Sequence, residues 1–263
     1  IAPTKCISAY KAMNIDLLTL ANNHILDQGK KGLDSSIETL KSAGISYVGV
    51  GDSIKDASKP KIISCNGKKI GIYACVEHEF TVATDTDSGA NPIDLLETPD
   101  HIVELKKQCD YVIVLYHGGK EQYRYPSPNL QKTCRKLVEK GADLVICQHS
   151  HCIGCKEEYL QGTIVYGQGN FLFDDEENEY WQTSLLIMLS SDFEVKYIPL
   201  KKTGNSVRLA KGAEAENILE QFNLRSEEIL DSDKVYQHYG ELADQYKNYY
   251  LFSVMKIKRG LLY

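Results

Sequence analysis

The sequence has no excess of basic residues. Its 263 residues include 30 lysines and arginines against 36 aspartates and glutamates, which gives a net charge of −6 at pH 7. A general nucleic-acid-binding protein is usually basic, so the composition argues against that class. There is also no apolar run that approaches the roughly 18 residues of a transmembrane helix. The longest candidates, such as Leu185–Leu189, have the length of a strand.

The cysteines lack the regular spacing of a disulfide framework. The eight are Cys6, Cys65, Cys75, Cys109, Cys134, Cys147, Cys152 and Cys155. Several lie in apolar patterns, as small core residues do, and this usage favours a reducing, cytoplasmic compartment or an anaerobic source. Cys147, Cys152 and Cys155 lie close to His151 in the sequence and leave open a structural zinc site, although no second Cys-x-x-Cys pair completes it.

Apolar strand patterns alternate with helical patterns over the first two hundred residues. Lys30–Ala43 has apolar residues at helical spacing, and Lys61–Val76 contains Asn66-Gly67, a strong signal for a two-residue hairpin turn. This alternation predicts an α/β protein. From about Ala213 the pattern becomes polar and helical. We therefore expect one domain over residues 1–204 and a C-terminal helical extension over residues 205–263.

The segment Asp143–His151 predicts a buried strand that ends in two histidines one residue apart. In an extended chain, side chains alternate between the two faces. His149 and His151 would therefore point to the same side, roughly 6.5–7 Å apart. Imidazole is the commonest neutral metal ligand, so the pair could serve one metal or two adjacent metals.

Two further predicted strands end in polar loops that carry a histidine. Ile15–Leu20 leads into a loop with His24, and Asp110–Tyr116 is followed by His117. Ligands of open α/β sheets bind at the carboxyl ends of the strands, where such side chains gather. With His149 and His151, four of the seven histidines occupy this kind of position. We expect these four imidazoles to converge on a single pocket.

Four spaced motifs carry a resemblance to a known family. They are Ala21–Gly29, Tyr116–Glu121, Gly141–His151 and Gly169–Phe171. In this order they resemble the calcineurin-like metallophosphoesterases and, more closely, the CapA/PgsA family of poly-γ-glutamate capsule biosynthesis proteins. The resemblance covers about residues 1–200. It implies an α-β-β-α sandwich of mixed sheets with two divalent metals (Mn, Fe, Zn or Mg) at the strand ends.

The resemblance also implies a role for each matching residue. His24 would be the catalytic acid, which contacts the phosphate or protonates the leaving group. The implied metal ligands are Asn23, His117 and His149 for one metal and His151 for the other. The implied supporting or substrate-binding residues are Asn22, Asp27, Glu121 and Asn170.

The sequence departs from the superfamily pattern at its beginning. Members carry an Asp-x-His and a Gly-Asp segment upstream of the Asn-His pair, and these supply carboxylates to the first metal. The chain begins at Ile1, too late to contain either, and Asp16 and Asp52 lie in the wrong context to replace them. We therefore expect an N-terminally incomplete domain that, on its own, binds metal weakly or not at all.

Two main functions remain open from the sequence, beside a third in which zinc stabilises an interaction module around Cys147–Cys155. The first is a metal-dependent, phosphoesterase-like hydrolase in capsule biosynthesis that acts on a phosphate-containing ligand. The second is a non-catalytic capsule assembly or export factor that binds polyglutamate, or the subunits of a capsule synthase or exporter. Proteins of the family are often anchored to the membrane outside the cell, whereas the cysteine usage favours the cytoplasm, so localisation is left open.

Overall fold

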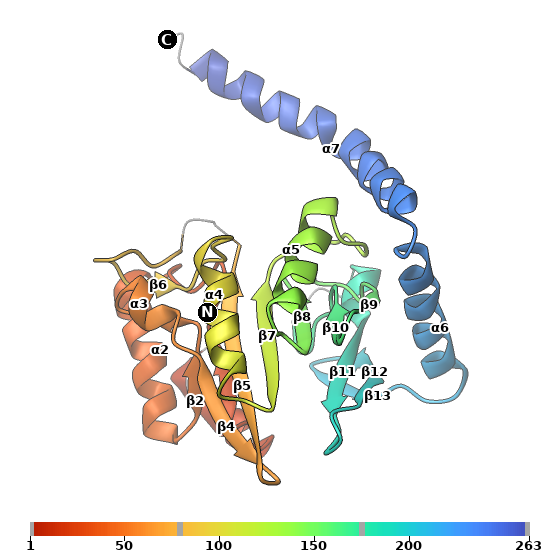
Figure 1. Ribbon diagram of the computed structural model, residues 1–263. Coiled ribbons are helices and arrows are strands. Elements are labelled where there is room, and N and C mark those ends of the chain that lie inside the picture. Colours follow the sequence, from red (N-terminus) through yellow and green to blue (C-terminus); the bar gives the residue numbers. More distant parts are fainter. Residues whose placement is uncertain (1–2, 78–80, 174–176, 261–263) are drawn as a thin grey trace.

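A six-stranded mixed sheet forms the centre of the fold (Figure 1). The computed structural model describes residues 3–77, 81–173 and 177–260. In spatial order the strands are β4 (Lys61–Cys65), β5 (Lys68–Val76), β7 (Tyr111–His117), β8 (Leu144–Gln148), β10 (Gly162–Val165) and β9 (Lys156–Tyr159). The four inner strands are parallel, and the two edge strands are antiparallel to their neighbours. The hairpin predicted around Asn66-Gly67 is confirmed as β4–β5.

Helices α4 (Glu97–Lys106) and α5 (Pro128–Glu139) cover one face of this sheet. Helix α5 begins where the Ser127 side chain accepts a hydrogen bond from the backbone N–H of Leu130, with Pro128 in the first turn. Its apolar face, which includes Leu137, is buried against strand residues such as Val145. The helices therefore cover the sheet from one side.

Strands of a second layer cover the other face. They are β1 (Leu17–Thr19) paired with β2 (Ser46–Val48), β3 (Val50–Gly51) paired with β6 (Gly89–Ala90), and the sheet of β11 (Thr183–Leu189), β12 (Val195–Thr203) and β13 (Ser206–Leu209). Helix α2 (Gly29–Ala43) packs on β2, with Leu33 and Val48 in one core with Ile72 of β5. The order of layers is helices, sheet, strands, helix, so the expected α-β-β-α sandwich is confirmed.

Short helices occupy several connections. These are η1 (Thr4–Cys6), α1 (Ile7–Ala12), α3 (Ile54–Ala57) and η2 (Glu179–Gln182). Six of the eight cysteines are buried, which confirms their expected role as small core residues. The core also contains an ion pair: Glu157, only 3% exposed, accepts hydrogen bonds from Arg135 and from Tyr166.

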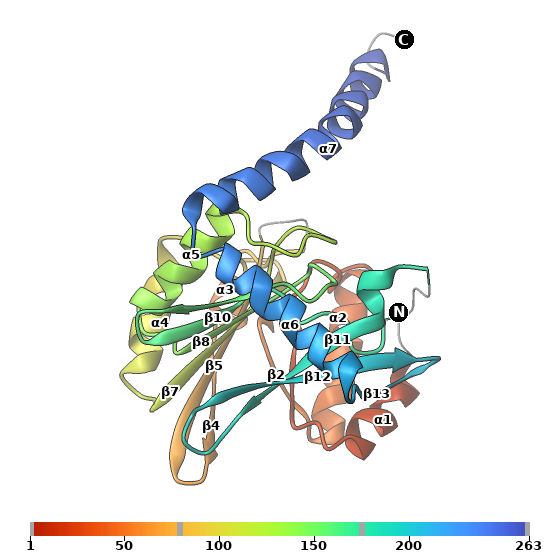
Figure 2. The same cartoon turned by 90° about the vertical axis from the view of Figure 1, so that its right-hand side faces the viewer.

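The C-terminal segment is helical, as predicted, with α6 (Ala213–Glu228) and α7 (Ser232–Gly260). Helix α6 packs beside β9 and β12 and buries Phe222 completely, whereas α7 runs away from the sheets (Figures 1 and 2). Because β13 lies beyond residue 204 and still pairs with β12, a domain boundary at 204/205 stays a prediction. Among the described residues, no helix combines the length and the apolar character needed to cross a membrane.

Candidate functional site

The carboxyl ends of β5, β7 and β8 lie side by side at one edge of the central sheet. Val76 is aligned with His117, and His117 with Gln148, so the residues that follow these positions emerge together. The rings of His117 and His149 have centroids 4.9 Å apart. The sheet register therefore brings together two of the histidines that the sequence placed at separate strand ends.

His149 and His151 do not continue β8, contrary to the extended chain we expected. The strand ends at Gln148, and both histidines have left-handed backbone conformations, with φ of 88° and 59°. Such angles are uncommon for residues other than glycine, although asparagine, aspartate and histidine adopt them more often than most, and they cluster at functional sites. The ring centroids are nevertheless 6.4 Å apart, so the turn through Ser150 keeps the two imidazoles near each other.

Asn23 reaches His117 from the other layer. Its Oδ1 atom lies 3.1 Å from Nε2 of His117. The loop after β1 holds it there, since Asn22 donates from its side chain to the carbonyl of Leu20 and accepts from the backbone N–H of His24. The predicted Asn-His pair thus places its asparagine against the histidine of β7.

The side chain of His24 points outward and is 68% exposed. Its Nδ1 lies 3.0 Å from a carboxylate oxygen of Asp27, which is itself exposed. A carboxylate at this distance fixes the orientation of the imidazole ring. His24 also borders a cavity of about 500 Å³ that is lined by Asn22 and Asp27.

The pKa of His117 is lowered to about 3. The largest cause is burial, followed by the nearby charges of His149, His151 and His24. Burial away from water disfavours the charged imidazolium. His117 is therefore neutral at physiological pH, the form in which an imidazole nitrogen binds a metal.

His151 lies among side chains from the segment that follows β10. Its Nδ1 is 2.8 Å from Oδ1 of Asn170, the indole of Trp181 stacks on it with centroids 4.9 Å apart, and Phe173 approaches to 5.0 Å. Asn170 Nδ2 and Trp181 Nε1 are buried and find no hydrogen-bond partner among the described residues. Beside one imidazole, these two donors have no acceptor within the described ranges, which is unusual for buried polar atoms.

Some contributing residues were missed by the sequence reasoning. Phe173 lies in a loop and Trp181 on the short helix η2, and neither segment directly follows a predicted strand. Glu77 follows β5 directly, and its carboxylate accepts a hydrogen bond of 2.7 Å from the backbone N–H of Gly119, next to His117. Because Glu77 directly follows a buried parallel strand, the rule used for the histidines could also have predicted it. The predicted Glu121 is exposed at the edge of the same loop.

The donor set fits part of a metal site. Two imidazoles and one amide oxygen, from His117, His149 and Asn23, lie together, and imidazole nitrogen with amide oxygen suits several divalent metals. Within the described ranges, however, no three or more His, Cys, Asp or Glu residues lie close enough to hold a metal ion. That finding includes the segment from Cys147 to Cys155, so the structural zinc site gains no support.

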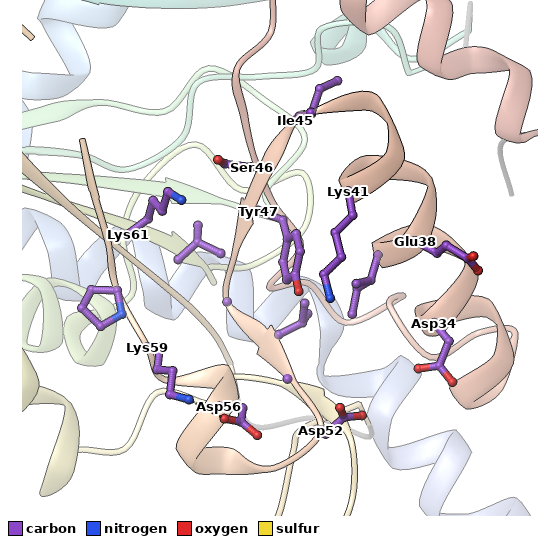
Figure 3. Close-up of a pocket in the computed structure, with 17 residues that line it drawn as sticks. Asp34, Glu38, Lys41, Ile45, Ser46, Tyr47, Asp52, Asp56, Lys59 and Lys61 are labelled. Carbon is purple, nitrogen blue, oxygen red and sulfur yellow. Dashed lines mark hydrogen bonds and ion pairs between the residues drawn. The ribbon is translucent and has the colours of Figure 1, made fainter. Parts of the chain in front are cut away.

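A separate cavity of about 880 Å³ lies between α2, β2, β3 and the segment before β4 (Figure 3). Its labelled charged residues are of both signs: Asp34, Glu38, Lys41, Asp52, Asp56, Lys59 and Lys61. None of the predicted site residues lines it. The strand-end histidines, rather than this cavity, therefore combine the chemistry that the sequence predicted.

Comparisons with known proteins give a family match over most of the chain. The model of the family described as "Bacterial capsule synthesis protein PGA_cap" matches residues 1–175. The chain is 32% identical over 179 residues to the capsule biosynthesis protein CapA of Bacillus anthracis, covering 66% of this chain and 44% of that protein. It is 30% identical over 171 residues to the PGA biosynthesis protein CapA of Bacillus subtilis (strain 168), covering 64% and 45%.

Among solved structures, the chain is similar to a putative 5'-nucleotidase from Staphylococcus aureus. The TM-score is 0.48 at 14% identity, covering 83% of this chain and 44% of that one. The chain spans less than half the length of both CapA relatives.

Proposed function

Because the chain belongs to the bacterial capsule synthesis protein family PGA_cap, we propose that it serves the synthesis of a poly-γ-glutamate capsule through a metal-dependent, phosphoesterase-like site. The family resemblance predicted from the four spaced motifs is confirmed by this match. The metal, the substrate and the partners of the whole protein are part of the proposal. Subunits of the capsule synthase or exporter are the partners we propose.

One observation carries the proposal. Asn23 and His117 come from different layers of the fold, yet their side chains meet at 3.1 Å, and His149 lies beside them. These three side chains are half-buried, and they gather at the carboxyl edge of the sheet. That is the edge at which α/β folds bind their ligands.

The proposed roles follow from the positions of the side chains. Asn23, His117 and His149 would hold one divalent metal, and His151 would face a second. A bound metal polarises a phosphoryl oxygen and lowers the pKa of a bound water. Asn170 Nδ2 and Trp181 Nε1, which lack a partner within the described chain, would donate hydrogen bonds to ligand oxygens. His24, oriented by Asp27, would give a proton to the leaving group.

A second candidate is a non-catalytic assembly factor that keeps the fold and binds polyglutamate. The observation that favours it is the incomplete donor set: the described residues contribute no group of three or more His, Cys, Asp or Glu ligands. In that case the protein would bind the polymer or partner subunits and would not catalyse a reaction.

Turnover of a chromogenic phosphodiester with added Mn²⁺, by the full-length protein, separates the two candidates. The phosphoesterase proposal expects hydrolysis that is lost in both His24→Ala and His149→Ala, with the fold retained. Metal-independent binding of polyglutamate without any hydrolysis would contradict it and favour the assembly factor.

A further inference from the structure

Two arginines that the proposed site does not use converge on one backbone carbonyl. Arg124, in the loop between β7 and α5, donates from Nε to the carbonyl oxygen of Ile153 at 3.0 Å. Arg225, on α6, donates from Nη2 to the same oxygen at 3.3 Å and from Nε to the carbonyl of Gly154 at 2.8 Å. Two guanidinium groups are thereby held close together.

Neither guanidinium forms an ion pair with a carboxylate within residues 3–77, 81–173 and 177–260. Arg225 is only 5% exposed, and its pKa is lowered to about 10, first by burial and then by the charge of Arg124. A buried cation without a counter-charge is costly, and buried charges in proteins are normally paired. Over these ranges of the chain, the pair therefore lacks an anion.

A cavity of about 240 Å³ opens beside Arg124. Its other lining residues are Ile153, Glu179, Tyr180 and Thr183. The guanidinium of Arg124 lies over the ring of Tyr180, 5.3 Å from its centroid, and only its Nε atom is used within the described chain. Its two terminal nitrogens form the fork that binds a carboxylate through two parallel hydrogen bonds. The cavity is smaller than the roughly 300–1,000 Å³ of a whole-ligand pocket, so it suits a single group of a longer ligand.

One short helix, η2, contacts both this cavity and His151. Tyr180, which forms part of the cavity wall, precedes Trp181 on helix η2, and Trp181 stacks on His151 at 4.9 Å. One short helix thus separates the arginine from the imidazole. A ligand with several anionic groups along its length could place one group at Arg124 and the next at the histidines.

We infer that Arg124 forms a carboxylate-binding subsite for an acidic polymer that extends into the histidine site, with Arg225 positioning it through Ile153. The inference rests on the proposed function, since γ-linked polyglutamate carries one free carboxylate on each residue. Glu179 lines the same cavity and repels an anion there, so its charge limits affinity. The same fork also accepts phosphate, and the experiment has to separate the two sources.

The test is calorimetric titration of the full-length protein with γ-linked glutamate oligomers, in chelator to exclude metal-dependent contacts. Arg124→Ala should weaken binding about tenfold or more, as loss of a charged hydrogen-bond pair predicts. Arg124→Lys should retain more affinity than Arg124→Ala but less than the wild type, because an ammonium group cannot bind a carboxylate through two parallel hydrogen bonds. Glu179→Gln should tighten binding. Lys211→Ala, which removes an exposed positive charge elsewhere, should leave it unchanged.

Equal affinity of the wild type and Arg124→Ala, in variants that unfold at the same temperature, would overturn the inference. Absence of wild-type binding to the oligomers, or binding of inorganic phosphate at the cavity in their place, would also overturn it. Because the titration needs neither metal nor turnover, Arg124-dependent binding can persist when phosphodiester hydrolysis fails. The two proposals therefore fail separately.

Discussion

Nε2 of His117 lies 3.1 Å from Oδ1 of Asn23, although 94 positions separate the two residues in the chain. One side chain comes from the central sheet and the other from the loop after β1, in the facing layer. The contact therefore depends on how the two layers pack against each other. It also places a nitrogen and an oxygen where one ion could bind both.

Divalent metal should stabilise the full-length protein through these side chains. We expect Mn²⁺ to raise the unfolding temperature and a chelator to reverse the rise, since a ligand at a hundred times its Kd adds about 2.7 kcal/mol. His117→Ala and Asn23→Ala should abolish the shift. His24→Ala should keep it, because His24 is proposed to move a proton rather than to hold metal. An unchanged shift in His117→Ala, measured by differential scanning fluorimetry, would contradict the assignment.

Stability in the absence of metal should fall with acid because His117 is buried in its neutral form. Its pKa is about 3 when folded and near 6.5 when unfolded, so the unfolded chain binds the proton first. The stabilisation is complete above pH 6.5 and is lost as the pH falls toward 3. We expect a loss of about 2–3 kcal/mol at pH 4.5, measured by urea unfolding. In His117→Asn, the free energy of unfolding should depend less steeply on pH. A slope equal to that of the wild type would show that His117 is not the cause.

The buried carboxylate of Glu157 should be essential for stability. It accepts from Arg135 Nε at 2.8 Å and from the hydroxyl of Tyr166 at 2.7 Å. Glu157→Ala leaves an arginine without its partner and should cost about 3–5 kcal/mol in the free energy of unfolding. The neighbouring Glu158, which is 61% exposed, gives the matched control. Glu158→Ala should change the free energy of unfolding by less than about 1 kcal/mol. Similar losses in the two variants would show that the burial of Glu157 does not make its ion pair important for stability.

Gly154 should not tolerate a side chain. A Cβ atom there would lie 2.2 Å from the carbonyl oxygen of Tyr166, which is backbone and cannot move aside cheaply. Gly154→Ala should destabilise the protein by about 1–3 kcal/mol through overpacking. Gly240→Ala, in helix α7 with no atom of the described chain within 4 Å, should be neutral or should stabilise by about 0.5–1 kcal/mol. Thermal unfolding of both variants tests the contrast; equal effects would contradict it.

Long, periodic elements of the fold could be predicted from the sequence. The hairpin β4–β5 has the bounds that the sequence predicts, because Asn66-Gly67 fixes the turn and the strands on either side are apolar. The rule that ligand-binding side chains follow parallel strands likewise predicts that His117 and His149 lie near each other, and their rings do. Both predictions rest on local patterns that tertiary packing does not override.

The details of the site could not be predicted in the same way. His149 and His151 adopt left-handed angles that few residues other than glycine take, so the expectation of an extended strand was wrong. Trp181 reaches His151 from the short helix η2, and Arg124 reaches Ile153 from the loop before α5. No periodicity encodes such a path. The sequence therefore identified the edge of the sheet that carries the site, but it did not reveal all the side chains that line it.

The most direct measurement is anomalous scattering from a crystal of the full-length protein soaked in Mn²⁺. The account predicts a peak within about 2.3 Å of His117 Nε2, of a ring nitrogen of His149 and of the Asn23 side-chain oxygen, as metal–ligand bond lengths require. No peak at these side chains, or a peak elsewhere in the fold, would contradict it.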